Sequence, residues 1–244
     1  MIKVEDLNVS YNNIPVLTNV NLEIPDGVSV GIVGPNGAGK STFLKAILGL
    51  IKKDMGSISI DGMGEKDFRK KVAYVPQRSE IDLSFPITVG QVVLTGTYPN
   101  MKVFQRPGKK EKLIAQKALE KVGLTEYSER AISDLSGGQL QRVYIARALA
   151  QEADYYFLDE PFVGIDMVSE KIIIDIIREL RDQGKTIVIV HHDLHKVTEY
   201  FDQLILVNRG VEAYGDVEDT FTTDNIKKAY GNTMGDITIK GVEK

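Results

Sequence analysis

The 244-residue sequence predicts an α/β fold with a mainly parallel sheet, an antiparallel β subdomain and an inserted α-helical subdomain. Apolar runs alternate with helical patterns, which is typical of parallel strands joined by helices. The first 25 residues and the segment 56–62 contain short runs that favour antiparallel strands. From 79 to 149 the strand pattern lapses. We expect one domain over 1–244, with a core at 1–78 and 150–244 and a helical subdomain at 79–149.

The central unit of this fold is a strand, a glycine loop and a helix. Residues 28–34 (VSVGIVG) are mainly apolar and predict a buried strand that ends in a loop. Residues 41–50 (STFLKAILGL) repeat apolar side chains three and four apart, which predicts a helix. Helices are also expected at 109–123 and at 168–184, where Gly184 is a stop signal. Further strands are expected in four apolar runs that end in polar or turn residues: 71–77, 155–161, 185–193 and 203–210.

Composition excludes several classes of function. The 30 lysines and arginines against 34 acids give a net charge of -4, so the chain as a whole is not attracted to nucleic acid or anionic lipid. The lack of cysteine excludes disulfides and cysteine-ligated metals. No apolar run reaches the roughly 18 residues of a membrane span, and the amino terminus lacks the features of a signal peptide. We expect a cytoplasmic chain that reaches membranes through a partner.

The segment 34–42 (GPNGAGKST) predicts a phosphate-binding loop, because it matches G-x-x-x-x-G-K-[ST] between a predicted strand and a predicted helix. The expected ATP-binding residues are Gly34, Pro35, Asn36, Gly37, Ala38, Gly39, Lys40, Ser41 and Thr42. The loop amides and the helix N-terminus favour anions, and Lys40 neutralises the β and γ phosphates. Ser41 offers a hydroxyl to Mg²⁺, and Thr42 is placed for the α phosphate. This pattern predicts the core of a P-loop NTPase.

Two acids end the apolar run 155–161 (YYFLDEP). Parallel sheets place their sites at the carboxyl ends of strands, so we expect Asp159 to hold Mg²⁺ through water and Glu160 to act as general base on the attacking water. For the pair alone, acids that mark the exit of a strand into solvent are an equal alternative. Coupled to a phosphate loop, a catalytic role is favoured.

The third motif is LSGGQ at 135–139, and with it the chain resembles the nucleotide-binding subunit of an ABC transporter over essentially its whole length. The resemblance implies that Ser136, Gly137, Gly138 and Gln139 face ATP bound to a second copy, in a homodimer that forms with ATP. For these residues alone, a helix-capping turn with Ser136 as N-cap is an alternative, compatible with the first.

The resemblance also implies roles for single residues. Tyr11 is expected to stack on adenine, and Gln77 to reach Mg²⁺ or the attacking water. His192 is expected to contact the γ phosphate, because the family pattern places this histidine directly before an aspartate; its neighbour His191 is the alternative. Asp166 matches the loop that crosses the dimer interface. Catalytic roles thus fall on Gln77, Glu160 and His192.

Further segments resemble the ATPase subunits of manganese, zinc and iron uptake systems: EPFVGID, VHHDL, FPITVGQVVLTG and NRGVEAYG. This implies integral membrane permease subunits, an extracytoplasmic metal-binding protein and a peripheral location at the cytoplasmic face of the membrane. The chain itself needs no site for the transported metal: His191 and His192 would point to opposite faces of a strand. We expect a permease contact in 77–91, where Ile81, Leu83 and Phe85 mix with acids; local packing is the alternative.

Other classes of ATPase remain as alternatives. An ATPase domain of this type could belong to a transporter of another solute, or to a soluble protein that acts on DNA or ribosomes. Long coiled coils, a second ATPase domain and a basic surface are typical of such soluble proteins, and the sequence has none of them. We therefore expect no nucleic-acid partner. A module that binds ATP without hydrolysing it is the third alternative, and the presence of Glu160 argues against it.

Overall fold

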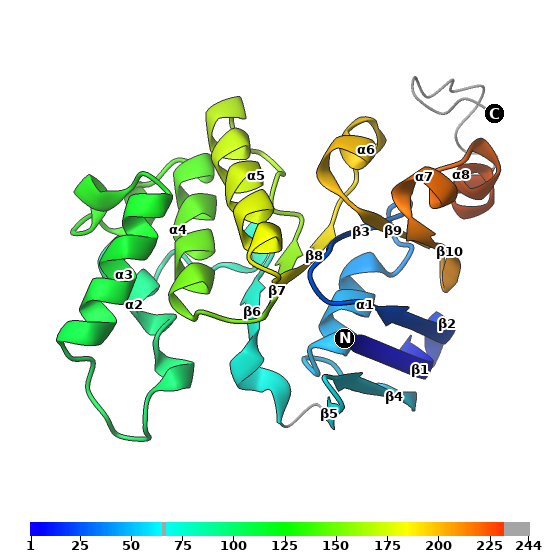
Figure 1. The fold of residues 1–244 in the computed structure, drawn as a ribbon, viewed down its shortest axis with the longest axis horizontal. Helices are drawn as coiled ribbons and strands as arrows, with labels where there is room; N and C mark the ends of the chain where they lie inside the picture. The colour runs from blue at the N-terminus through cyan, green and yellow to red at the C-terminus, as the bar shows by residue number, and fades with distance from the viewer. Residues whose placement is uncertain (65–66, 232–244) are drawn as a thin grey trace. The chain divides into compact units, whose positions relative to one another are not determined.

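The computed structural model describes residues 1–64 and 67–231, and the chain forms two compact units. The first comprises Met1–Phe68 and Thr186–Lys244, and the second comprises Arg69–Lys185. Figure 1 shows strands and helices in both. The predicted fold class is confirmed: parallel strands, an antiparallel sheet and helices are all present.

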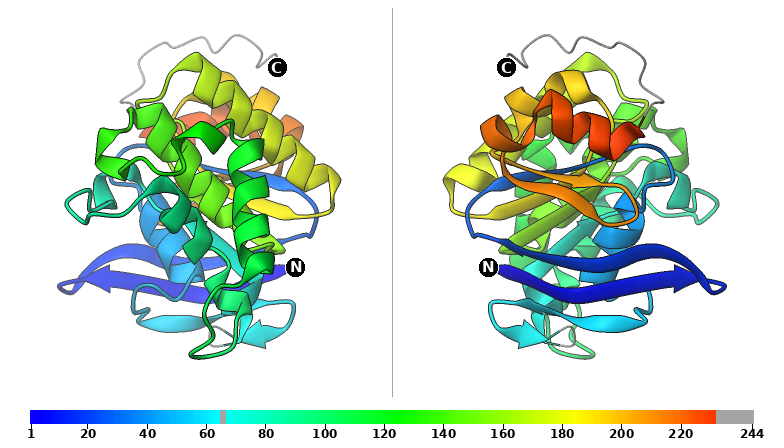
Figure 2. Two further views of the ribbon diagram at one scale, coloured as in Figure 1. Left: turned by 90° about the vertical axis from the view of Figure 1, so that its left-hand side faces the viewer. Right: turned by 90° about the vertical axis from the view of Figure 1, so that its right-hand side faces the viewer.

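An antiparallel sheet in the first unit has the strand order β2-β1-β4-β5. Its strands are β1 (Ile2–Tyr11), β2 (Ile14–Ile24), β4 (Met55–Ile60) and β5 (Met63–Gly64). Asn12 and Asn13, with φ of 50° and 63°, form the two-residue turn between β1 and β2, as a hairpin with two left-handed turn residues requires. The long β1–β2 hairpin is visible in both views of Figure 2. One face of β1 packs inward through Ile2, Val4, Leu7 and Val9.

Parallel strands form the second sheet of this unit. β3 (Ser29–Val33) lies between β8 (Thr186–Val190) and β9 (Gln203–Val207), and β10 (Val211–Asp216) adds an antiparallel edge to β9. Every residue of β3 and β8 is buried, as continuous apolar runs predict. The sequence prediction missed β10, because its side chains are half-exposed or exposed and give no apolar run.

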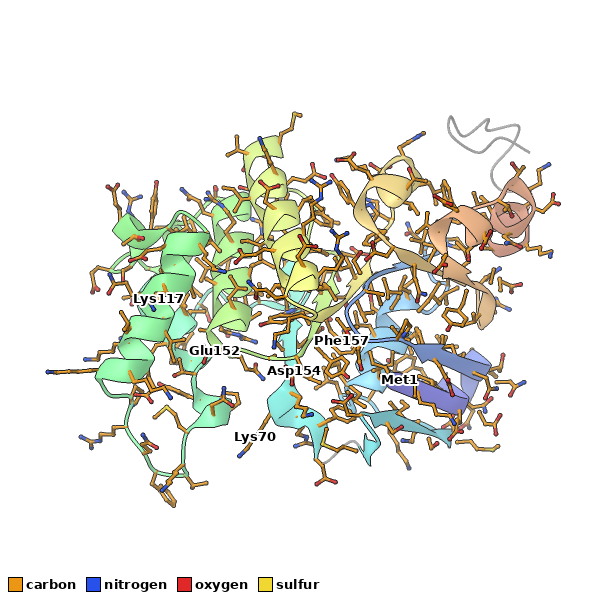
Figure 3. All side chains as sticks on the ribbon, in the orientation of Figure 1. Met1, Lys70, Lys117, Glu152, Asp154 and Phe157 are labelled. Atoms are coloured by element: carbon orange, nitrogen blue, oxygen red, sulfur yellow. The ribbon has the colours of Figure 1, made fainter. Side chains whose placement is uncertain are left out.

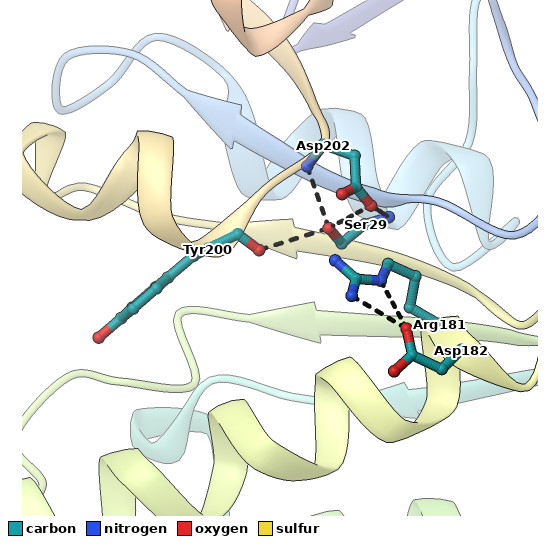
Figure 4. Close-up of polar contacts among 5 residues, drawn as sticks. All are labelled: Ser29, Arg181, Asp182, Tyr200 and Asp202. Carbon is teal, nitrogen blue, oxygen red and sulfur yellow. Dashed lines mark hydrogen bonds and ion pairs between the residues drawn. The ribbon is translucent and has the colours of Figure 1, made fainter.

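In the part that the structure describes, the first unit has four α-helices, and hydrogen bonds fix the start of β3 to the segment before β9. The helices are α1 (Lys40–Ile47), α6 (Val197–Tyr200), α7 (Val217–Thr220) and α8 (Thr223–Tyr230). The Ser29 amide and hydroxyl both donate to Asp202 Oδ2 at 2.8 Å, and the Asp202 amide donates back to Ser29 Oγ at 3.1 Å (Figure 4). These bonds join the start of β3 to the segment before β9, which fixes the strand that leads to the glycine loop.

The second unit contains two parallel strands and four α-helices. The strands are β6 (Val72–Val75) and β7 (Tyr155–Asp159). The helices are α2 (Val89–Thr95), α3 (Lys109–Lys121), α4 (Gly137–Ala150) and α5 (Met167–Asp182). Between the two strands the chain consists of helices, turns and one isolated bridge that pairs Thr88 with Ala131. This helical stretch carries the LSGGQ segment at the start of α4.

Short 3₁₀ turns connect these elements, at Phe68–Lys71, Arg78–Glu80, Tyr98–Asn100, Thr125–Tyr127, Ile132–Asp134 and Leu194–Lys196. Within residues 1–64 and 67–231, no helix is both long enough and apolar enough to cross a membrane.

Candidate nucleotide-binding and catalytic residues

The glycine loop lies between β3 and α1 in the first unit, as predicted. A Cβ on Gly34 would lie 2.0 Å from the carbonyl oxygen of Val207, so no larger residue fits where β3 ends beside β9. Gly39 caps α1 with φ of 97°, a left-handed conformation that glycine adopts without strain. The glycine loop therefore leads directly into the N-terminus of α1, and a glycine-rich loop at a helix N-terminus favours anions.

Lys40 is 7% exposed, and its ammonium group is held over the loop. Its Nζ donates to the carbonyl oxygens of Gly34 (2.9 Å) and Pro35 (3.0 Å). Backbone carbonyls thus solvate a buried cation. The same contacts hold a positive charge beside the glycine loop, which suits a phosphate.

Tyr11 is 46% exposed and stands at the tip of the β1–β2 hairpin, paired with Ile14. The same hairpin reaches the glycine loop, because a Cβ on Gly39 would lie 3.0 Å from Leu17 and 3.3 Å from Val16. An exposed aromatic ring on an element that contacts the loop is available to stack on a base.

The structure separates the two adjacent histidines after β8. His191 is 2% exposed and packs edge-on against Phe201, with ring centroids 5.6 Å apart, so it belongs to the core. His192 is exposed. In the parallel register Val190 lies opposite Ile32, so His192 follows β8 at the edge where the glycine loop follows β3. This placement favours His192 as the residue that contacts phosphate.

Gln77 and Glu160, predicted from segments 83 residues apart, meet in the second unit. Gln77 Nε2 donates to Glu160 Oε2 at 2.7 Å. Each residue lies just beyond the carboxyl end of a strand, Gln77 after β6 and Glu160 after β7. Glu160 has φ of 50°, an uncommon conformation for a residue with a side chain, and such strain is concentrated at functional sites. The hydrogen bond therefore orients the Glu160 carboxylate.

Asp159 ends β7 and is 1% exposed. Burial, together with the charges of Asp159 and Glu80, raises the pKa of the nearby Tyr74 hydroxyl. Within the described residues, no group of three or more His, Cys, Asp or Glu side chains is placed to hold a metal ion. Proteins bind Mg²⁺ through one or two carboxylates, while phosphates and water supply the other ligands. A buried carboxylate, a hydroxyl at Ser41 and an amide at Gln77 are oxygen donors, the type of ligand that Mg²⁺ prefers.

Ser136 caps α4, as the capping alternative expected. Its Oγ accepts from the Gln139 amide (3.3 Å), while its own amide donates to Gln139 Oε1 (2.9 Å). A Cβ on Gly138 would lie 2.4 Å from Asp166 Oδ2, so the predicted loop acid packs against the predicted signature. Asp166 in turn caps α5 by accepting from the Ser169 amide at 2.9 Å, and this bond lowers the pKa of its carboxyl.

Two residues near the candidate groups were not predicted. A Cβ on Gly137 would lie 2.2 Å from Arg78 Nη1, so a guanidinium group stands at the start of the signature helix. The sequence could have indicated Arg78 only through its position directly after Gln77. Burial raises the pKa of Tyr230 to about 12, against the opposing effect of the Gly34 amide beside its hydroxyl. Tyr230 therefore lies against the first residue of the glycine loop, a contact with no sequence signal.

Comparison with known proteins agrees with these motifs. Residues 17–163 match the family model described as ABC transporter. The chain is 55% identical to the manganese transport system ATP-binding protein MntB of Listeria innocua, over 94% of this chain and 95% of that protein. It is 49% identical to the zinc transport system ATP-binding protein TroB of Treponema pallidum, over 96% of this chain and 88% of that one.

A solved structure has the same fold. A dimeric ATP-binding cassette in a post-hydrolysis state, bound to ADP and Pi, matches with a TM-score of 0.78 and 29% identity, over 89% of this chain and 99% of that one. Extensive sequence identity, a matching family model and a shared fold lead to one conclusion: the chain belongs to the ABC transporter family.

Proposed function

We propose that this chain binds and hydrolyses MgATP and thereby drives uptake of manganese or zinc, with iron as a third candidate, through separate permease subunits. The observation that carries the ATPase part is the glycine loop with Lys40 buried above its carbonyl oxygens. The metal is supported by the relatives, which are named as manganese or zinc transport proteins at 46–55% identity.

Each candidate residue has its own role in ATP binding or hydrolysis. The loop amides and Lys40 bind the β and γ phosphates, and Tyr11 stacks on adenine. Glu160, oriented by Gln77, accepts the proton of the attacking water, and His192 donates a hydrogen bond to the γ phosphate. Mg²⁺, when bound with ATP, supplies positive charge at the phosphates; Ser41, Gln77 and Asp159 would hold it.

Two further partners belong to this proposal. The dimeric cassette bound to ADP and Pi supports a homodimer with ATP, in which Ser136, Gly137, Gly138, Gln139 and Asp166 face the nucleotide of the other copy. For the permease we propose the strip Ile81, Leu83 and Phe85. Leu83 is 38% exposed and Phe85 63%, so this strip is available to a partner. Through the permease the chain would lie at the inner face of the membrane.

Reconstitution tests the function. The chain and the permease with which it co-purifies are placed in proteoliposomes, with the extracytoplasmic metal-binding protein outside. We expect ATP-driven accumulation of manganese or zinc, and ATP hydrolysis that rises when the binding protein carries metal. The complex with Glu160→Gln is the control and should do neither. Accumulation of another solute, with no response to manganese, zinc or iron, would refute the proposed substrate.

A further inference from the structure

A turn in the second unit presents two apolar side chains to solvent. The Gln105 amide donates to the Lys102 carbonyl oxygen (3.0 Å), and the Lys102 amide donates to Gln105 Oε1 (3.2 Å), so the four residues form a closed turn. Val103 and Phe104 occupy its tip and are 83% and 101% exposed. Packing within the chain therefore does not explain why apolar residues occupy these two positions.

The backbone of the turn makes this exposure more informative. Phe104 has φ of 66°, at the third turn position, where glycine or asparagine is usual and a bulky residue is uncommon. The base of the loop is nevertheless fixed, because Asn100 Nδ2 donates to the Gln151 carbonyl oxygen at 2.7 Å. Figure 1 shows the loop between α2 and α3 extending beyond the lower end of α3. A strained aromatic on a projecting, anchored loop points to a contact outside the chain.

Positive charge surrounds this tip. From Gln91 to Leu119 the sequence has one acid, Glu111, and its carboxylate accepts from the Gly108 amide at 2.8 Å. The same stretch has six cationic residues, all exposed: Lys102, Arg106, Lys109, Lys110, Lys112 and Lys117. Because the whole chain has a net charge of -4, this concentration is local. We name Lys102–Lys117 the basic tip.

The basic tip continues into an apolar hollow beside α3. Lys110, Leu113 and Lys117 line a cavity of about 450 Å³ together with Leu149, Leu180 and one acid, Glu152. Figure 3 labels Lys117 on this helix and Glu152 beside it. Lysines around an apolar surface suit a ligand that is anionic at one end and apolar at the other.

We propose that the basic tip binds the surface of an anionic phospholipid bilayer directly, in addition to the contact with the permease. Val103 and Phe104 enter the boundary between headgroups and acyl chains, while the surrounding cations bind lipid phosphates. The projecting form of the loop favours this occupant over an acidic protein, which would need a pocket that fits Phe104. The proposal requires neither ATP hydrolysis nor a particular transported ion.

A fluorescence experiment tests insertion. The chain has no tryptophan, so Phe104→Trp carries a single indole. With vesicles of equal parts phosphatidylglycerol and phosphatidylcholine, we expect its emission to shift to shorter wavelength and brominated acyl chains to quench it. Leu50→Trp is the control, because Leu50 is 56% exposed in the first unit. An indole at position 104 that is quenched no more than the control would overturn the proposal.

Sedimentation with the same vesicles tests which residues of the basic tip contribute to lipid binding. Val103→Ser with Phe104→Ser, and separately Lys109→Glu with Lys110→Glu, should each weaken binding on the order of tenfold or more, and high salt should weaken binding of the unmodified chain. Exposed residues of the first unit supply matched controls: Leu50→Ser with Met55→Ser, and Lys52→Glu. Full ATP binding by every variant shows that the fold is intact.

Several results would contradict direct lipid binding. The unmodified chain could fail to sediment with anionic vesicles, or sediment equally with pure phosphatidylcholine. The variants could also bind vesicles as the unmodified chain does yet lose co-purification with the permease. That last pattern would assign the basic tip to an acidic protein surface.

Discussion

The hydrogen bond between Gln77 and Glu160 restricts the carboxylate that we propose as the general base. At 2.7 Å, Glu160 Oε2 already accepts a hydrogen bond from the amide, so Oε1 is the more accessible oxygen for a proton from water. The amide also holds a side chain that would otherwise sample several rotamers. Orientation of a general base by a neutral partner leaves its charge in place, which the proposed reaction requires.

Lys40 gives the first prediction at this scale. Lys40→Ala removes the cation that lies over the loop carbonyls, so ATP binding should weaken by at least about tenfold and hydrolysis by about a thousandfold. Calorimetric titration with ATP and a phosphate-release assay measure the two effects. Lys52→Ala, an exposed lysine of the same unit, is the control and should change neither. Unchanged turnover in Lys40→Ala would refute the role of the loop.

The adjacent histidines His191 and His192 give a second prediction, because one is buried and the other is exposed. His191→Ala leaves a cavity beside Phe201 and should lower the free energy of unfolding by about 2–4 kcal/mol. His192→Ala removes an exposed side chain and should change stability by about 0.5 kcal/mol or less, while hydrolysis falls roughly a hundredfold. Urea denaturation and phosphate release separate the two roles. Loss of hydrolysis in a fully stable His191→Ala protein would reverse the assignment.

These histidines also show what sequence could supply. The order of residues in the family pattern selected His192, yet nothing in the two letters HH tells which ring is buried, because that depends on Phe201 ten residues later. The contact of Arg78 with Gly137 is of the same kind. It brings together two residues 59 positions apart, and only the folded second unit does so.

Whole elements were more predictable than contacts. Strands buried on both faces, such as β3 and β8, leave an unbroken apolar run, and the glycine loop has a fixed spacing. Edge strand β10 leaves no such run, since every one of its side chains is at least partly exposed. A strand of that type is specified mainly by its partner β9.

The junction of β3 with the glycine loop gives an element-scale prediction. Gly34→Ala forces a methyl group against the Val207 carbonyl oxygen, 2.0 Å away, and should destabilise the chain by about 1–3 kcal/mol. Gly37→Ala meets nothing within 4 Å, so only its φ of 78° opposes the change, at about 1–2 kcal/mol. Urea denaturation compares the loss in free energy of unfolding between the two variants, and we expect the larger loss for Gly34→Ala. A larger loss for Gly37→Ala would show that conformational strain outweighs the contact with β9.

At the scale of the whole molecule, we propose that one chain supplies parts of two ATP sites. The phosphate loop would bind one nucleotide, and the segment that begins at Ser136 would face the nucleotide of a second copy. Ser136 is already the N-cap of α4, so its hydroxyl alone does not distinguish a cap from a ligand contact. Association of two chains does distinguish them, because a helix cap acts within one chain.

Light scattering of Glu160→Gln with MgATP measures this association most directly. Without its base the chain should bind ATP and keep it, so we expect a monomer without nucleotide and a dimer with ATP. Adding Ser136→Arg should abolish the dimer, since the longer side chain would collide with the γ phosphate region of the partner copy. ATP binding by each monomer, measured by titration, should survive. A double variant that dimerises with ATP as readily as Glu160→Gln alone would contradict the claim and leave LSGGQ as a helix cap.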